Sequence, residues 1–110
     1  MADTGRVLIV DDDPAQLRLL RAVLEADGWG VSQADSGDAA IRRLESGGEI
    51  DVIVTDLMMP GMDGGALLAR VHERWPEIPV IILTAHGSVD SAVELLRAGV
   101  HDYLTKPPKL

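Results

Sequence analysis

The sequence predicts an α/β fold, in which a doubly wound five-stranded parallel sheet carries helices on both faces. Short apolar runs alternate along the chain with amphipathic segments of helical length, which is the pattern of strands joined by crossover helices. Three of these runs are continuously apolar, as expected for parallel strands buried on both faces. A length of 110 residues is enough for one domain and too short for two, so residues 1–110 are interpreted as a single domain.

Five apolar runs are predicted to form the strands. The second and fifth runs are more polar than the others, so we place them at the two edges of the sheet. This placement predicts the strand order 2-1-3-4-5, which is one of the common orders of doubly wound folds. The predicted strands cover residues 7–10, 31–34, 52–55, 80–83 and 101–105.

Four amphipathic segments between the strands are predicted to be helices. The first covers residues 14–27, with a proline in its first turn and a glycine after its end. The second follows a Ser36 cap, Pro76 stops the third, and Ser88 caps the fourth, which a glycine follows. The helix residues expected to be buried are Leu17, Leu20, Leu24, Ala40, Ile41, Leu44, Leu67, Val71, Trp75, Val89, Val93 and Leu96.

The composition excludes several classes of function. The formal net charge of -8 argues against direct nucleic-acid binding, which normally requires a basic patch. The absence of cysteine excludes disulfides and thiolate metal sites. No apolar run approaches the length of a membrane-spanning helix, and the first residues do not resemble a signal peptide. We therefore expect a cytoplasmic protein that has no contact with a membrane.

Four aspartates are expected where the predicted strand order reverses. Asp11, Asp12 and Asp13 follow the first strand and Asp56 follows the third. Ligands of doubly wound sheets bind beyond the carboxyl ends of the strands at such a point. Like charges about 4 Å apart repel by about 4 kcal/mol at an effective dielectric constant of about 20, and a bound cation removes this cost. Oxygen ligands indicate Mg²⁺, with Mn²⁺ or Ca²⁺ as alternatives. In the other reading the three consecutive aspartates only cap the next helix, which leaves Asp56 unexplained.

Two further polar residues end strands at the same edge of the sheet. Thr84 closes the fourth strand and Lys106 closes the fifth. Separately they read as a threonine before a helix and a solvated lysine. Together with the aspartates they form the set that phosphoryl transfer to a carboxylate needs. This set consists of a nucleophile, a metal, and a hydroxyl and an ammonium group that hold the phosphoryl oxygens.

At these positions the sequence resembles the response regulator receiver family of two-component signalling. The resemblance covers nearly the whole chain and rests on four motifs in order at the expected spacing. They are VDDDP at 10–14, DLMMPGMDG at 56–64, LTA at 83–85 and DYLTKP at 102–107. The resemblance implies a flavodoxin-like fold and a signalling domain rather than an enzyme. Such a domain promotes only its own Mg²⁺-dependent phosphorylation and dephosphorylation.

The resemblance also implies a role for each residue of the acidic site. Asp56 is the phosphoacceptor, and the phosphodonor is a histidine kinase. Asp12 is a direct ligand of Mg²⁺ and Asp11 is a ligand through water. Asp56 and the backbone carbonyl of Met58 complete the protein's share of the coordination.

A second group of residues is implied to respond to phosphorylation. Thr84 and Tyr103 are the switch pair, because the threonine hydroxyl moves to the phosphoryl group and the tyrosine ring follows it inward. The ordinary reading of Tyr103, an edge-strand aromatic that covers the core, is compatible with this role. Lys106 pairs with the phosphoryl group or with unmodified Asp56. The Lys106–Pro107 peptide is expected to be cis, which would aim the lysine at Asp56.

The resemblance further implies partners. Leu19 points away from the leucine stripe of its helix and is a candidate for docking the kinase, although a single exposed leucine needs no special explanation. The stretch TAHGSV at 84–89 looks most like receivers of nitrogen-regulation-type transcription factors. This similarity implies an ATPase or DNA-binding output domain outside the chain.

The chain departs from the family pattern at its C-terminus. Family members continue past the Lys-Pro pair into a fifth helix, whereas this sequence stops at Leu110. We therefore expect the C-terminal helix to be absent and an apolar strip of the sheet to lie uncovered beside the first helix. A longer parent protein or a homodimer would cover this strip.

Three alternative functions fit the sequence less well than the receiver. A phosphatase with an aspartate nucleophile would need a D-x-D motif followed by Thr or Val, which the segment 11–15 does not supply. A flavin or nucleotide module would need a first loop rich in Gly, Ser and Thr, and this loop is acidic. A degenerate receiver that serves only as an interaction surface should lack an acid, Thr84 or Lys106, and the sequence has them all.

Overall fold

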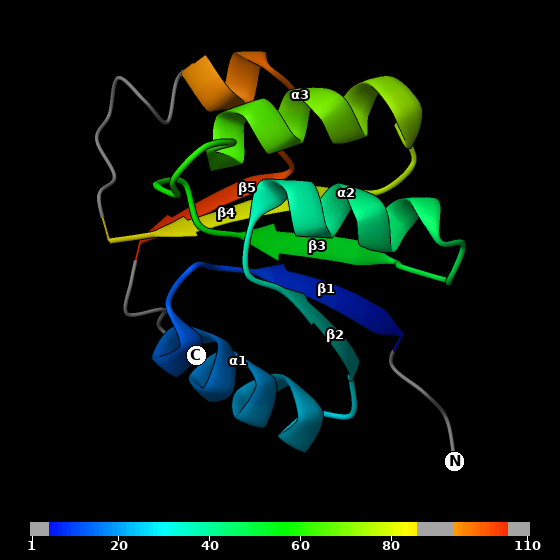
Figure 1. The fold of residues 1–110 in the computed structure, drawn as a ribbon, viewed down its shortest axis with the longest axis vertical. Helices are drawn as coiled ribbons and strands as arrows, with labels where there is room; N and C mark the ends of the chain where they lie inside the picture. Colours follow the sequence, from blue (N-terminus) through cyan, green and yellow to red (C-terminus); the bar gives the residue numbers. More distant parts are fainter. Residues whose placement is uncertain (1–4, 86–93, 106–110) are drawn as a thin grey trace.

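The computed structural model describes residues 5–85 and 94–105 of the chain (Figure 1). It contains a five-stranded sheet with helices above and below it. The strands are β1 (Arg6–Val10), β2 (Gly30–Ala34), β3 (Val52–Thr55), β4 (Val80–Thr84) and β5 (Asp102–Thr105), and the helices are α1 (Pro14–Ala26), α2 (Gly37–Glu45) and α3 (Gly64–Arg74). Residues 94–97 are also helical.

The sheet has the order β2-β1-β3-β4-β5, and all four strand pairs are parallel. The predicted strand order is therefore confirmed, and each predicted strand agrees with the structure within one residue at either end. The edge strands are the more polar ones, since their outer sides have no neighbouring strand to bury them. The order reverses beside β1, where the chain first moves outward to β2 and then crosses to β3.

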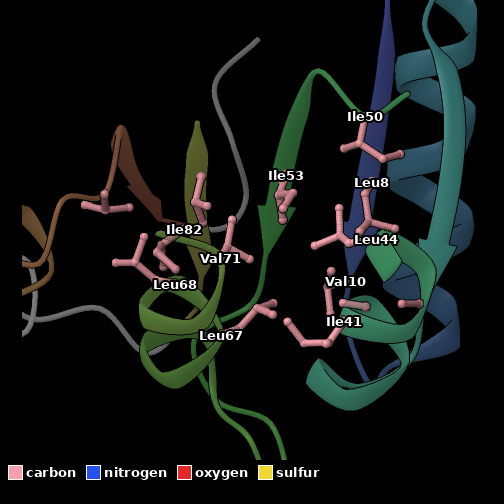
Figure 2. Packing of buried hydrophobic residues seen from close by; sticks show 14 of the residues in the cluster. Leu8, Val10, Ile41, Leu44, Ile50, Ile53, Leu67, Leu68, Val71 and Ile82 are labelled. Atoms are coloured by element: carbon pink, nitrogen blue, oxygen red, sulfur yellow. The ribbon is translucent and has the colours of Figure 1, made fainter. Parts of the chain in front are cut away.

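Two apolar clusters hold the helices to the sheet. The smaller cluster joins α1 to one face through Val7, Ile9, Leu17 and Val31. The larger cluster joins α2 and α3 to the other face through alternate strand residues such as Leu8 and Ile53, which are fully buried (Figure 2). The helices begin where side chains accept backbone N–H groups, as predicted for Ser36, whose hydroxyl oxygen accepts from the N–H of Ala39 at 3.0 Å.

The predicted buried face of the fourth helix is wrong by one residue. Leu96 was expected inside, but its side chain is 58% exposed, whereas the neighbouring Leu95 is 7% exposed and belongs to the larger cluster. Successive helix residues point about 100° apart, so the orientation that places Leu95 in the larger cluster turns Leu96 toward the solvent. The other residues predicted for this helix, Ser88, Val89 and Val93, lie outside the described residues.

Some predicted core residues are only partly buried. Leu20 and Leu24 pack at the margin of the smaller cluster, while Leu17 is its buried helix residue. Trp75 follows α3 as its C-cap and packs against the larger cluster without being fully buried. Its ring also lies under the guanidinium group of Arg74, 4.4 Å from the ring centroid.

The sheet face that carries α1 is incompletely covered at the side of β4 and β5. Val54 of β3 and Ile81 of β4 are half-buried, and Leu104 of β5 is 43% exposed. The described residues therefore leave these three side chains only partly covered, whereas Leu83 of β4 on the same face is buried. None of the described helices is long and apolar enough to cross a membrane.

Candidate functional site

The acidic residues come together because two central strands end side by side. Asp11 directly follows β1 and Asp56 directly follows β3. The backbone N–H of Asp56 donates to the carbonyl oxygen of Val10 at 2.9 Å. The backbone N–H of Asp11 donates to the carbonyl oxygen of Ala34 at 3.2 Å. The sheet hydrogen bonds thus continue one residue beyond the strands. They fix the backbone of both aspartates at the point where the strand order reverses.

Three carboxylates converge at this point. Asp11, Asp12 and Asp56 each offer a carboxylate oxygen, and these oxygens all lie within 4.8 Å of one another. Asp11 is buried, Asp56 is half-buried and Asp12 is exposed, so the group is open to solvent on one side. The cavity beside it measures about 320 Å³ and is lined by Asp11, Asp12, Asp13, Gln16, Asp56, Met58 and Ala85.

Capping explains only part of this cluster. Asp13 is the N-cap of α1, and its Oδ1 accepts the N–H of Ala15 at 2.9 Å. The Oδ1 of Asp11 accepts the N–H of Asp13 at 3.0 Å and thereby orders the loop. Neither interaction accounts for the approach of Asp12 and Asp56, which cap no described helix. The reading in which all three consecutive aspartates serve as caps is therefore insufficient.

The donor set fits a hard divalent cation. All the converging side-chain atoms are carboxylate oxygens, and the site holds no nitrogen or sulfur ligand among the described residues. Mg²⁺ favours such oxygens and retains several waters, which a solvent-open cavity allows. Met58 lines the same cavity and is 57% exposed.

Asp56 is held in a defined orientation. Its Oδ1 accepts the N–H of Leu57 at 2.8 Å, and its backbone carbonyl accepts the hydroxyl of Thr55 at 3.0 Å. Thr55 is fully buried, so this contact joins the aspartate to the rigid end of β3. The Leu57 N–H thus orients the carboxylate, and the Thr55 hydroxyl orients the backbone of Asp56.

The predicted switch residues lie on adjacent strands. Thr84 is the last residue of β4 and is fully buried. Tyr103 of β5 pairs with Ile82, two residues before Thr84, and is half-buried against the larger cluster. Side chains two residues apart in a strand share a face, so Thr84 and Tyr103 lie on the same face of the sheet. Lys106 and the Lys106–Pro107 peptide lie outside the described residues.

The cavity includes two residues that the sequence reading did not select. Gln16 lies three residues after the Asp13 cap, in the first turn of α1, and Ala85 directly follows Thr84. The spacing of Asp13 and Gln16 is that of a capping box, which is the signal by which Gln16 could have been found. Ala85 carries no chemical group that would have singled it out.

Comparison with known proteins identifies a family. The family model described as the response regulator receiver domain matches residues 7–110. The transcriptional regulatory protein GlrR of Escherichia coli is 45% identical over 103 residues, which are 94% of this chain and 23% of that protein. The DNA-binding transcriptional regulator NtrC of Salmonella typhimurium is 41% identical over 103 residues, 94% of this chain and 22% of that protein. The chain thus spans less than a quarter of the length of these curated relatives.

Solved structures agree with this match. A response regulator receiver domain protein from Clostridium thermocellum has a TM-score of 0.90 at 34% identity, covering 96% of this chain and 84% of that chain. The response regulator TrrA from Thermotoga maritima, solved in complex with Mg²⁺ and BeF, has a TM-score of 0.84 at 28% identity. The match covers 94% of this chain and 87% of that one.

Proposed function

Because this chain belongs to the response regulator receiver domain family of two-component signalling, we propose that it is a phosphorylation-dependent switch. In this proposal Asp56 accepts a phosphoryl group from a histidine kinase in the cytoplasm. The resulting change in conformation controls an output domain or a downstream protein. The family is one of signalling domains rather than of catalytic enzymes.

The observation that carries the proposal is the convergence of three carboxylates at the strand-order reversal, with their oxygens within 4.8 Å of one another. A merely structural cluster of this kind would be costly, because like charges repel strongly when they are partly removed from water. A metal-assisted phosphoryl acceptor needs this arrangement. It requires one carboxylate as the nucleophile and others that hold the cation beside it.

In the proposed reaction, an Asp56 carboxylate oxygen attacks the phosphorus atom of the donor. A P–O bond to Asp56 forms as the P–N bond of the phosphohistidine breaks, and the imidazole leaves with the bonding electron pair. The N–H of Leu57 and the hydroxyl of Thr55 hold Asp56 in place, so that little reorganisation is needed during attack. Hydrolysis of the acyl phosphate by water returns the carboxylate.

Asp11, Asp12, Asp56 and the backbone carbonyl of Met58 would hold Mg²⁺ in this proposal. When bound, the ion neutralises charge on the transferring phosphoryl group. The buried Asp11 organises the loop through the N–H of Asp13, and in this proposal the exposed Asp12 is the direct ligand. Lys106 completes the proposed set by pairing with the phosphoryl oxygens.

Thr84 and Tyr103 are the proposed relay from the site to the surface. The Thr84 hydroxyl lies at the end of β4 and would gain a phosphoryl oxygen as a hydrogen-bond partner. Tyr103 shares its face and is only half-buried, so its ring has surface left to bury. Phosphorylation shifts the equilibrium only by the difference in affinity between the two conformations, so the change is expected to be a population shift.

Leu19 is the proposed contact for the kinase. The structure confirms that it points away from the core, since its side chain is 57% exposed on α1, the helix that follows the acidic loop. Its replacement by alanine should slow phosphotransfer from the cognate kinase while leaving labelling by a small phosphodonor unchanged. Equal rates of kinase-dependent transfer would show that Leu19 is an ordinary exposed leucine.

The identity of the output is proposed from the relatives. GlrR and NtrC are transcriptional regulators, so an ATPase or DNA-binding domain is the proposed output, with no direct nucleic-acid contact by this domain. The uncovered strip that contains Val54, Ile81 and Leu104 is proposed to be covered by further chain or by a second copy in a homodimer. Sedimentation of the 110-residue chain as a monomer at micromolar concentration would exclude the homodimer.

Metal-dependent labelling tests the proposed function. Incubation with acetyl phosphate should add a phosphoryl group in the presence of Mg²⁺, and chelation of divalent ions should prevent it. Labelling that needs no metal would contradict the proposed site. Steady turnover of a small phosphoester without a stable labelled protein would favour the phosphatase. No labelling under either condition would favour a flavin module or a degenerate interaction domain.

A further inference from the structure

A pair of arginines converges on one hydroxyl group at the edge of the sheet opposite β5. Ser32 is a half-buried residue in the middle of β2. Its hydroxyl oxygen accepts from Nη1 of Arg6 at 3.3 Å and from Nη2 of Arg43 at 3.2 Å. Arg6 begins β1 and Arg43 lies in the last turn of α2. Two positive groups from distant parts of the sequence therefore meet at one neutral oxygen atom.

These two charges are not neutralised by nearby acids. In the part of the chain that the structure describes, the only ion pair joins Arg74 to Glu45, at 2.8 Å. Arg6 does contact an acidic residue, but through its backbone. Its N–H donates to Oδ2 of Asp51 at 2.8 Å, and the guanidinium group takes no part in this bond. The chain has 18 acidic residues and a net charge of -8. The hydrogen bonds of both guanidinium groups therefore go to hydroxyl groups, although acidic residues outnumber basic ones in the chain.

The local sequence leaves room for both guanidinium groups. A Cβ atom at Gly30 would lie 3.2 Å from Nη2 of Arg6, and a Cβ atom at Gly48 would lie 2.7 Å from Nη1 of Arg43. Glycine at these two positions lets each guanidinium group lie against backbone. β2 is an edge strand, so no other strand of the described sheet lies beyond it. The two groups thus have fixed positions at an open edge.

We propose that Arg6, Arg43 and Ser32 form a binding site for a phosphate-type oxyanion. The two guanidinium groups supply forked donors that match tetrahedral oxyanions, and the Ser32 hydroxyl can turn to donate a further hydrogen bond. An anion would remove the repulsion between the two arginines. The site lies on the α2 side of β2, away from the metal-binding carboxylates, and it does not depend on the function proposed for Asp56.

The test is a titration of the wild-type protein without divalent metal, followed by NMR at the Ser32 amide and the arginine Nε–H groups. Inorganic phosphate and phenyl phosphate are added separately, with ionic strength held constant by sodium chloride. Saturable shifts at these groups are expected. Response to both ligands would identify an open site that accepts phosphate monoesters, and response to inorganic phosphate alone would restrict the site to the free ion.

Matched variants decide whether the arginines are responsible. Arg6→Gln and Arg43→Gln should each weaken binding roughly tenfold, because each removes a charge-assisted hydrogen bond. Arg42→Gln removes an equal charge from the same helix turn without touching Ser32, and should leave binding unchanged. Phosphate should also raise the melting temperature of the wild type and Arg42→Gln more than that of Arg43→Gln. Shifts that chloride reproduces, or a phosphate affinity in Arg43→Gln equal to that of the wild type, would overturn the proposal.

Discussion

The backbone of Gly64 lies directly against the carbonyl oxygen of Asp56, so that no side chain fits between them. A Cβ atom built at Gly64 would clash with this oxygen and lie 2.9 Å from the Cα atom of Leu57. The N–H of Gly64 also donates to the carbonyl of Leu57 at 2.8 Å. The start of α3 thereby positions the loop that carries the proposed phosphoacceptor, and a missing side chain is part of the site.

Replacement of Gly64 by alanine is predicted to damage both stability and phosphorylation. The added methyl group must displace backbone rather than a flexible side chain, so we expect a loss of about 1–3 kcal/mol in unfolding free energy. Gly65→Ala is the matched control, because its nearest neighbour would be Oδ1 of Asp63 at 3.4 Å. Denaturant unfolding should show Gly65→Ala close to the wild type or slightly more stable. Equal stability of the two variants would contradict the close approach.

Asp12 and Asp13 are predicted to differ in their importance for Mg²⁺ binding. Asp12 belongs to the carboxylate cluster, whereas Asp13 caps α1. Asp12→Asn should weaken Mg²⁺ binding strongly in a calorimetric or NMR titration. Asp13→Asn keeps a capping side chain and removes an equal charge from the same cavity. Because Asp13 is not one of the three converging carboxylates, this variant should weaken Mg²⁺ binding less. A larger loss in Asp13→Asn would show that the ligand assignment is wrong.

Thr84 is predicted to control the response of Tyr103 to phosphorylation. Tyr103 is the only tyrosine of the chain, so its ring signals in an NMR spectrum need no further assignment. They should shift on phosphorylation in the wild type and in Thr84→Ser, which keeps the hydroxyl. Thr84→Ala should reduce the shift, because no hydroxyl then moves toward the phosphoryl group. An undiminished shift in Thr84→Ala would separate the two residues.

Leu95 and Leu96 are predicted to have very different effects on stability. Leu95 is 7% exposed within the larger cluster and Leu96 is 58% exposed. Leu95→Ala should cost about 2–5 kcal/mol in unfolding free energy, because it leaves a cavity in the core. Leu96→Ala should stay within about 0.5 kcal/mol of the wild type. The reverse ranking would restore the helix face that the sequence pattern suggested.

The sheet was predictable because its signals are local and redundant. The runs that became β1, β3 and β4 are apolar throughout, and the polar edge strands follow from having one open side. The three cluster aspartates were also predictable, since strand order alone brings the ends of β1 and β3 together. Here the sequence carries both the position of each residue and the carboxylate group that converges there.

Other features depend on packing that one sequence does not show. Both Leu95 and Leu96 fit an apolar helix stripe, and the choice between them is made by contacts with α3, where Gly65 leaves space near Leu95. Arg6 and Arg43 are 37 positions apart in the sequence, and both donate a hydrogen bond to the hydroxyl oxygen of Ser32. Neither arginine has a sequence motif that would indicate this contact.

The central claim is that Asp56 alone accepts the phosphoryl group, and intact-mass measurement tests it most directly. The wild type, Asp56→Asn and Asp35→Asn are each incubated with acetyl phosphate and Mg²⁺. Asp35 is the matched control, because it is an exposed aspartate that follows the carboxyl end of β2, just as Asp56 follows the carboxyl end of β3. The wild type and Asp35→Asn should gain the mass of one phosphoryl group, and Asp56→Asn should gain none. Labelling of Asp56→Asn at the wild-type rate would contradict the account.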